Sequence, residues 1–318
     1  MNELITDIKT LQNETLNNLK NSKAKNTIRA YKSDFKDFAA FCIKHGFKNL
    51  PTEPKVVSLY LTYLSSKNNK LSTLRRRLVS IGMIHKFQGH YLDTKHPIII
   101  ENLMGIKRIK GSNQRGKKPI LISDLKTIID QIDKEKIGNI KKTRDKAIIL
   151  TGFSGGFRRT ELINIDYEDL DFVQEGVKIY IKRSKTDQFG EGMIKGLPYF
   201  SNQKYCPIVN LKKWITISNI KNGPVFRRFN KGLALSSNRL TDQSVALMIK
   251  NYLDLGGIDN KNYSGHSLRS GFATVTAQSG ADERSIMAMT GHKTTQMVRR
   301  YIKEGNLFTN NALSKVKI

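Results

Sequence analysis

A strongly basic stretch about a third of the way along the chain divides the sequence into two parts. Residues 108–119 read RIKGSNQRGKKP, with two glycines and almost no apolar side chains. A segment of this composition cannot contribute to a hydrophobic core and is typical of a linker. We therefore predict two domains, over residues 1–107 and 119–318, joined by a linker over 108–118, with each domain long enough to bury its own core.

The first predicted domain has helical periodicity throughout. Its apolar side chains recur every three or four residues, which places them on one face of each helix. Asn26 is expected to cap one of these helices and Gly46 to end it. The prediction is a small all-helical domain, with a possible separate helix within residues 1–20 and further helices over 26–45, 54–64, 71–87 and 97–107.

The second predicted domain combines helices with a small sheet. Apolar and polar residues alternate over 177–181 and 193–199, which predicts two strands joined by a polar turn. The fold class predicted for the whole chain is mainly α, with a small antiparallel β-sheet in the C-terminal domain (α+β). Helices are expected after a cap at Ser123, from Arg144 to about Phe153, and over most of the chain from Leu211 on.

Charge and cysteine content narrow the function classes. The formal net charge is +28, so the chain attracts polyanions such as DNA, RNA or anionic membranes. A membrane role is disfavoured, because there is no run of about 18 apolar residues and the first ten residues lack the layout of a signal peptide. Cys42 and Cys206 are typical of buried thiols in a reducing compartment, so we expect a cytoplasmic protein that binds nucleic acid.

Two groups of basic residues are candidates for DNA contacts. Arg75, Arg76 and Arg77 stand in a row at the start of a predicted helix, and Lys117 and Lys118 lie at the end of the predicted linker. Runs of like charge are most often solvated surface. In the linker, which joins two basic domains, a strap lying along phosphates is an equally good interpretation.

The strongest chemical signal is a set of residues in the second domain that suits phosphoryl transfer. Two guanidinium groups can hold the nonbridging oxygens of a phosphodiester as negative charge develops on them. A phenol can form an ester with phosphorus, but only about one in a thousand is ionised at pH 7 unless cations favour the phenolate. No metal or nucleotide cofactor is needed for this chemistry, and we expect none. The set is Arg158, Lys185, His266, Arg269, His292 and Tyr301.

The other members of this set can handle protons. His266 lies three residues before Arg269, an offset that places both on one face of a helix. Histidine can donate a hydrogen bond to phosphate or move a proton near neutral pH, and Lys185, in the polar turn, can protonate a leaving oxygen. Glu161, three residues after Arg158, is expected to support that arginine. A zinc site at the histidines is disfavoured, because no cysteine or carboxylate stands at ligand spacing.

In order and spacing, these residues resemble the tyrosine recombinases, the phage integrase family. The first motif of that family is similar to TGFSGGFRRTELINIDYEDLDF, in which the position three before the acidic residue selects Arg158 over Arg159. The resemblance extends over residues 25–305. The hairpin lysine of the family matches Lys185, its H-x-x-R motif His266 and Arg269, its later histidine His292, and its nucleophile Tyr301.

The resemblance implies a site-specific DNA recombinase. The two domains would form a C-shaped clamp around duplex DNA, and Tyr301 would form a 3′-phosphotyrosyl link that a 5′-hydroxyl from a partner duplex later attacks. Lys185 would serve as general acid and His266 as base, with four protomers acting on two duplexes. The tail over 302–318 either docks on a neighbouring protomer or packs locally.

Two other functions use the same sequence features. A relaxing topoisomerase of the same chemistry would act as a monomer without sequence preference. A non-catalytic DNA-binding protein could use the helix–glycine–helix pattern over 267–303, although such a protein would have no need of Tyr301. All three bind DNA in a salt-dependent way, so salt dependence does not distinguish them.

Overall fold

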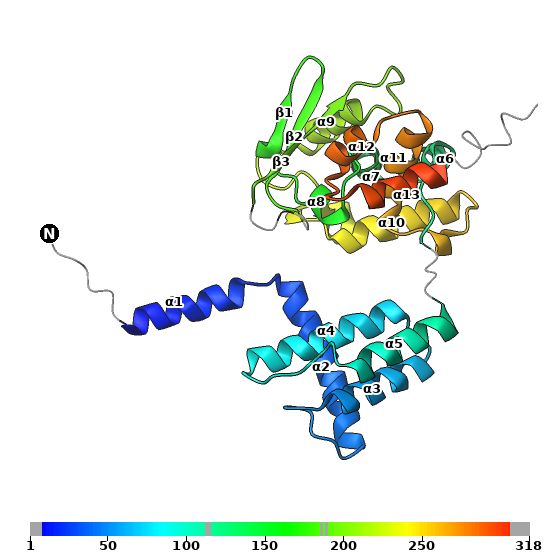
Figure 1. Cartoon of the computed structure of the whole chain (residues 1–318). Helices are drawn as coiled ribbons and strands as arrows, with labels where there is room; N and C mark the ends of the chain where they lie inside the picture. The colour runs from blue at the N-terminus through cyan, green and yellow to red at the C-terminus, as the bar shows by residue number, and fades with distance from the viewer. Residues whose placement is uncertain (1–7, 112–115, 185–186, 188–189, 306–318) are drawn as a thin grey trace, which may run out of the picture. The chain divides into compact units, whose positions relative to one another are not determined.

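The computed structural model describes residues 8–111, 116–184, 187 and 190–305 (Figure 1). The chain divides into two compact units, Met1–Arg115 and Gly116–Ile318. The mainly helical fold with small antiparallel sheets confirms the predicted fold class. None of the helices in the described parts of the chain is both long and apolar enough to cross a bilayer.

The described part of the first unit is helical, and three of its helices begin where the sequence indicated. Pro54, Leu71 and Pro97 open α3, α4 and α5, as predicted. Asn26 is not a cap, because α2 begins one residue earlier and follows Ala24. α5 continues three residues beyond the predicted end at Lys107, so part of the expected linker is helical. The helices are α1 Ile8–Asn21, α2 Lys25–Lys44, α3 Pro54–Ser66, α4 Leu71–Phe87 and α5 Pro97–Lys110.

The core of the first unit lies among α2, α3, α4 and α5. Aromatic side chains meet at its centre, where the ring of Phe38 lies edge-on to Tyr60 with 5.1 Å between centroids. Cys42 is also buried and forms no disulfide. The buried apolar side chains include Phe38, Leu61, Leu64, Leu74, Ile81, Ile99 and Leu103.

The second unit is built around α7, whose side chains are buried along its second half. α9 and α11 pack against it, and Figure 1 shows the other helices arranged around them. α7 begins five residues before the predicted start at Arg144. Ser123 is not a cap, because α6 begins at Ile122 and already includes it. The helices are α6 Ile122–Lys134, α7 Asn139–Ser154, α8 Arg159–Ile163, α9 Pro207–Ser218, α10 Asp242–Leu255, α11 Ser267–Gln278, α12 Glu283–Thr290 and α13 Thr295–Gly305.

The sheet of the second unit has three antiparallel strands in the order β1-β2-β3. The predicted pair is present as β2 Gly176–Ile181 and β3 Met193–Pro198, with Ile179 opposite Lys195. The third strand, β1 Leu170–Phe172, was not predicted, because three residues are too few to show alternation.

A second, two-stranded sheet corrects the expectation that the chain is mostly helical after Leu211. β4 Arg227–Phe229 pairs with β5 Leu235–Arg239. Only Ser236 of these two strands is buried, so the segment shows no alternation of apolar and polar residues that would have indicated a sheet.

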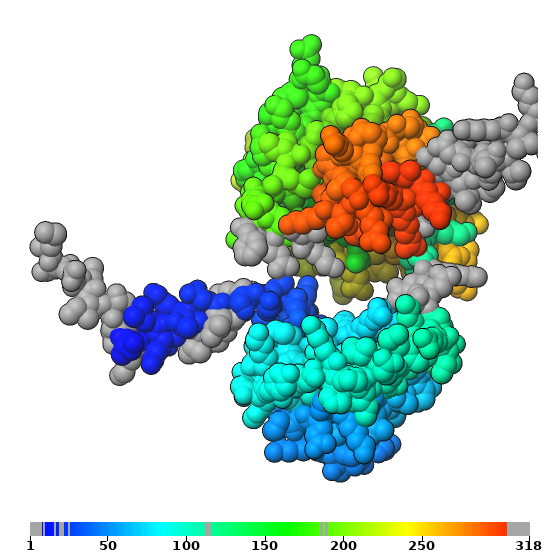
Figure 2. All heavy atoms as spheres, in the orientation of Figure 1, coloured from blue at the N-terminus to red at the C-terminus, as the bar shows by residue number. Residues whose placement is uncertain are grey.

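Two separate apolar clusters hold the second unit together. The larger cluster includes α7, α9 and the inner face of the sheet. The smaller one consists of Ala273, Ala277, Ile286 and Val298, from α11, α12 and α13. In the space-filling view, the segment coloured orange to red, which contains α12 and α13, forms part of the surface of this unit (Figure 2).

Candidate active site

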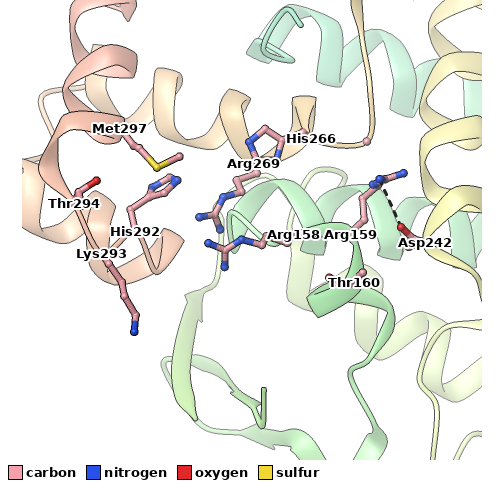
Figure 3. Close-up of a pocket in the computed structure, with 11 residues that line it drawn as sticks. Arg158, Arg159, Thr160, Asp242, His266, Arg269, His292, Lys293, Thr294 and Met297 are labelled. Carbon is pink, nitrogen blue, oxygen red and sulfur yellow. Dashed lines mark ion pairs between the residues drawn. The ribbon is translucent and has the colours of Figure 1, made fainter. Parts of the chain in front are cut away.

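Four of the six predicted residues line one open cavity of about 550 Å³ in the second unit. Four segments far apart in the sequence contribute to it: the turn from α7 into α8, the start of α10, the start of α11, and the loop between α12 and α13 with the first turn of α13. Figure 3 shows the side chains of Arg158, His266, Arg269 and His292 directed toward a common space. The cavity is lined by Arg158, Arg159, Thr160, Asp242, Gly265, His266, Arg269, His292, Lys293, Thr294 and Met297.

Arg158 is fixed by Glu161, the residue predicted to support it. The Glu161 carboxylate accepts a bond from the Arg158 backbone N–H at 2.9 Å and a second from its guanidinium at 2.5 Å. This arrangement is possible because Arg158 precedes α8, so that the carboxylate of the first turn folds back onto it. The next residue, Arg159, points toward Asp242, with 3.6 Å between its guanidinium nitrogen and a carboxylate oxygen of Asp242 (Figure 3).

Arg269 is completely buried in the first turn of α11. One guanidinium N–H donates to the Gly156 carbonyl at 2.9 Å. The Nε and the other terminal nitrogen are buried and have no hydrogen-bond partner among the described residues. Burial, together with the charge of Arg158, lowers the pKa of Arg269 to about 10, so the group is still protonated at neutral pH. A buried cation with unused donors is suited to an anion.

His292 is held in one orientation by Thr290. The Thr290 hydroxyl lies 2.6 Å from the Ile286 carbonyl, to which it donates its one proton, and 2.8 Å from Nδ1 of His292. Nδ1 is therefore the donor of the second bond, which leaves Nε2 able to accept a proton. Burial lowers the pKa of His292 to about 4, aided by the charges of Arg269 and Arg158, so the ring is neutral at pH 7.

Tyr301 lies on α13, beside the ring of His292, with 6.2 Å between their centroids. It lines a second, smaller cavity of about 290 Å³. His266, which is exposed just before α11, lines both cavities and so connects them. The structure thus brings together five of the six predicted residues.

Lys185 lies outside the described residues, but part of its turn is described. The Asp187 carboxylate accepts bonds from the backbone N–H groups of Gly190, Glu191 and Gly192, at 2.8 to 3.1 Å. The tail beyond Gly305 and the first seven residues, with Leu4 and Ile5 of the expected first helix, are likewise outside the described chain.

The segment around Lys117 and Lys118 is attached beside the candidate site. The Lys117 ammonium donates to the Lys261 carbonyl at 2.5 Å, and the Lys118 N–H to the Asn262 carbonyl at 2.7 Å. The N–H of Ile120 then donates to the Ser267 carbonyl at 3.0 Å, next to His266. This anchoring sets the path of the chain where it enters the second unit.

The three arginines of α4 differ from one another. Arg76 forms an ion pair with Asp34, and Arg77 with Asp37, so both link α4 to α2. Arg75 is exposed on the same helix. The structure therefore gives Arg76 and Arg77 a role within the fold in addition to any contact with DNA.

Sequence reasoning missed one residue next to the site. Lys195, on β3, is completely buried, and its ammonium donates to the Gly155 carbonyl at 2.8 Å. The alternation over the strand places it on the same face as Leu197, which points into the core. A lysine at an inward position of a predicted strand was the signal that could have identified it.

The chain is similar to a known family and to known proteins over most of its length. Residues 120–306 match the model of the phage integrase family. The chain is 41% identical over 301 residues to an integrase/recombinase xerD homolog of Selenomonas ruminantium, covering 94% of this chain and 87% of that protein. It is also 24% identical to the tyrosine recombinase XerC of Staphylococcus carnosus, covering 89% and 88% of the two chains.

Solved structures share the fold. The XerH site-specific recombinase bound to its palindromic difH substrate superposes with a TM-score of 0.63 at 17% identity, over 83% of this chain and 72% of that one. A lambda integrase dimer bound to a core site superposes with a TM-score of 0.59 at 14% identity, over 93% of each chain.

Proposed function

The chain belongs to the phage integrase family of tyrosine recombinases, which are DNA strand-exchange enzymes, and we propose that it cleaves and rejoins DNA through Tyr301. The phenolic oxygen of Tyr301 attacks the scissile phosphorus, and the bond from phosphorus to the 5′ oxygen breaks. The product is a 3′-phosphotyrosyl link and a free 5′-hydroxyl. Because the link keeps the energy of the phosphodiester, a second 5′-hydroxyl can reverse the step without ATP.

Proton transfer is divided among three residues in this proposal. His266 accepts the phenolic proton, since it lines the cavities on both sides and is exposed to solvent. Lys185 gives a proton to the departing 5′ oxygen. His292 is held by Thr290 through Nδ1 and is neutral before DNA binds. In this proposal its Nε2 takes up a proton when the anionic phosphate enters the cavity, and the resulting N–H donates to a nonbridging oxygen.

The observation that carries the proposal is the pair of arginines at one cavity. Arg158 is aimed by Glu161, and Arg269 has two buried donors without a partner among the described residues. A phosphodiester in displacement gathers charge on its nonbridging oxygens, and these two groups are placed to hold it. The unused donors of Arg269 then become satisfied only when a phosphate is bound.

DNA is the partner on which the enzyme acts. We propose that four protomers bring two duplexes together, that the two units close around one duplex as a clamp, and that this takes place in the cytoplasm. Arg75, Lys117 and Lys118 supply further contacts to the DNA backbone, which position the duplex without reading its sequence. Of the predicted tail over 302–318, residues 302–305 belong to α13; the remainder is proposed to dock on a neighbouring protomer.

The test is a suicide substrate, a duplex nicked close to the cleavage point. After cleavage, the short fragment that carries the released 5′-hydroxyl diffuses away, so that the covalent link cannot be resealed. The wild-type protein is expected to accumulate a covalent adduct with its target DNA, visible as a slower band on a denaturing gel. Tyr301→Phe removes only the nucleophilic oxygen and should give no adduct. Tyr180→Phe, at an exposed tyrosine on β2, is the matched control and should behave as wild type. An adduct with Tyr301→Phe would overturn the proposal.

A further inference from the structure

Lys195 occupies a position where a lysine is unusual. It is the third residue of β3, opposite Ile179, and none of its surface is exposed. Its neighbours on the inner face of the sheet, Ile179 and Leu197, are apolar core residues. Burying an ammonium among such groups costs free energy unless specific partners offset it. The partners that offset the burial of the Lys195 ammonium therefore indicate its role in the structure.

The partners of the Lys195 ammonium all belong to the segment 155–161. It donates to the Gly155 carbonyl at 2.8 Å and lies 3.9 Å from the nearer carboxylate oxygen of Glu161. It also lies over the ring of Phe157, 4.3 Å from the centroid. A cation above an aromatic face is stabilised by the ring quadrupole. One side chain thus contacts three of the seven residues of the segment 155–161, which contains Arg158.

The same segment holds both arginines of the candidate site. Gly155 offers its carbonyl to Lys195, and the next residue, Gly156, offers its own to Arg269 at 2.9 Å. Glycine is required at the first position, because a Cβ there would lie 2.1 Å from the Phe157 ring. Glu161 accepts from Arg158 on one side and pairs with Lys195 on the other. Lys195 therefore contacts Glu161, which binds Arg158, and Gly155, which is the neighbour of the residue that binds Arg269.

The charges in this group are arranged in alternation. Burial raises the pKa of Glu161, but the Lys195 ammonium and the bonds from Arg158 outweigh burial, so that the net shift of the pKa is downward. Glu161 is thus an anion next to the guanidinium of Arg158 and the amine of Lys195. Burial lowers the pKa of Lys195 to about 7, and within that shift Glu161 favours the ammonium while Arg269 and Arg158 oppose it. Loss of the Lys195 ammonium would leave the Gly155 carbonyl without its partner and Glu161 held from one side only.

We propose that Lys195 is a positioning residue for the two phosphate-binding arginines: its bonds to Gly155 and Glu161 fix the turn that aims Arg158 and the carbonyl that holds Arg269. The inference rests on the proposed function, because it assumes that these arginines hold the scissile phosphate. Lys195 itself does not touch the DNA.

The test uses a substrate whose cleavage depends less on stabilisation of phosphate charge by Arg158 and Arg269. A methylphosphonate at the scissile position replaces one nonbridging oxygen by a methyl group and removes its negative charge. In Lys195→Met, which keeps the length of the side chain, cleavage of the ordinary phosphodiester is expected to fall about tenfold to a hundredfold, as for a small displacement of a catalytic group. Cleavage of the methylphosphonate should fall much less.

The comparison of substrates separates positioning from loss of structure. Both rates are measured on one preparation, so the fraction of folded protein cancels in their ratio. The ratio of phosphodiester to methylphosphonate rate should be lower in Lys195→Met than in wild type. Lys178→Met, on the exposed face of the neighbouring strand, is the matched control and should keep the wild-type ratio. If Lys195→Met does not fold, Lys195→Gln, which retains a donor for Gly155, is measured in the same way.

Two results would overturn the inference. One is an equal loss of both rates in the Lys195 variant, which would indicate a role in stability alone. The other is a variant that cleaves both substrates as fast as wild type. Failure of the proposed function is seen separately, because wild type would then form no adduct with the phosphodiester substrate.

Discussion

The two halves of the candidate active site are supported differently. Arg158 and Arg269 lie on segments that adjoin the large apolar cluster around α7 and are tied together through Glu161 and two glycine carbonyls. His292 and Tyr301 belong to the segment α12–α13, which rests on the small cluster of two alanines, Ile286 and Val298. The two arginines thus adjoin a large buried apolar cluster, whereas the segment that carries His292 and Tyr301 rests on a small one.

The largest expected effect comes from removing a phosphate-binding group from the half that adjoins the large cluster. Arg269→Met should lower the rate of DNA cleavage about 10²-fold to 10³-fold, as for the loss of a preorganised donor to a transition-state charge. The free energy of unfolding should not fall in parallel, because the substitution also removes buried donors that have no partner among the described residues.

Arg228→Met is the matched control for this measurement, since Arg228 is an exposed arginine of β4 that is not among the residues lining the cavity. Single-turnover cleavage and thermal unfolding are measured on both variants. Equal losses of cleavage in the two would contradict the assignment of Arg269 as the phosphate-binding arginine.

The next effect compares the two apolar clusters directly. Ile149→Ala, in the large cluster, should lower the free energy of unfolding by about 2–5 kcal/mol. Val298→Ala, in the small cluster, removes two methyl groups and should lower it by about 2 kcal/mol or less. Fluorescence of Trp214, the single tryptophan and a buried residue of the second unit, reports the unfolding of that unit in urea. A larger loss of unfolding free energy in Val298→Ala than in Ile149→Ala would contradict the difference proposed between the two clusters.

A smaller effect is expected in the pH dependence of the free energy of unfolding, because the pKa of His292 is lowered in the folded protein. The pKa of His292 is lowered from 6.5 to about 4 by burial and by Arg269 and Arg158, so between these pH values the unfolded chain binds a proton that the folded chain does not. The free energy of unfolding therefore falls as the pH drops from 6.5 to 4. His292→Gln should show a weaker dependence on pH in this window, measured by urea unfolding followed through Trp214.

His90→Gln provides the control, because His90 is an exposed histidine of the first unit. It should keep the pH dependence of wild type in the transition reported by Trp214. The same slope in wild type and His292→Gln would mean that the folded state binds this proton as readily as the unfolded chain.

Elements with a strong local pattern were predictable from the sequence. Alternation gave β2 and β3, and Pro54 marked the start of α3. The two strands β4 and β5 bury almost nothing, so no pattern of apolar residues indicated them. The early start of α7 was missed, because its first turn carries lysines and polar residues whose helical state depends on packing against other elements.

The identities of the candidate site residues could be predicted from residue type and spacing. The contacts that orient these residues in the folded chain could be predicted less well. The offset of three residues between Arg158 and Glu161 corresponds in the structure to two hydrogen bonds, whereas Arg159, which lines the same cavity, points toward Asp242. The fixed tautomer of His292 depends on Thr290, and the contacts of Lys195 depend on a turn about 40 residues away. Such long-range contacts leave little signal in one sequence.

The most direct measurement of the central claim is the identification of the residue that becomes linked to DNA. The covalent adduct formed on the suicide substrate is digested with nuclease and protease, and the peptide that carries the remaining nucleotide is sequenced by mass spectrometry. The account predicts a phosphodiester on the phenolic oxygen of Tyr301. A nucleotide attached to any other side chain would contradict it.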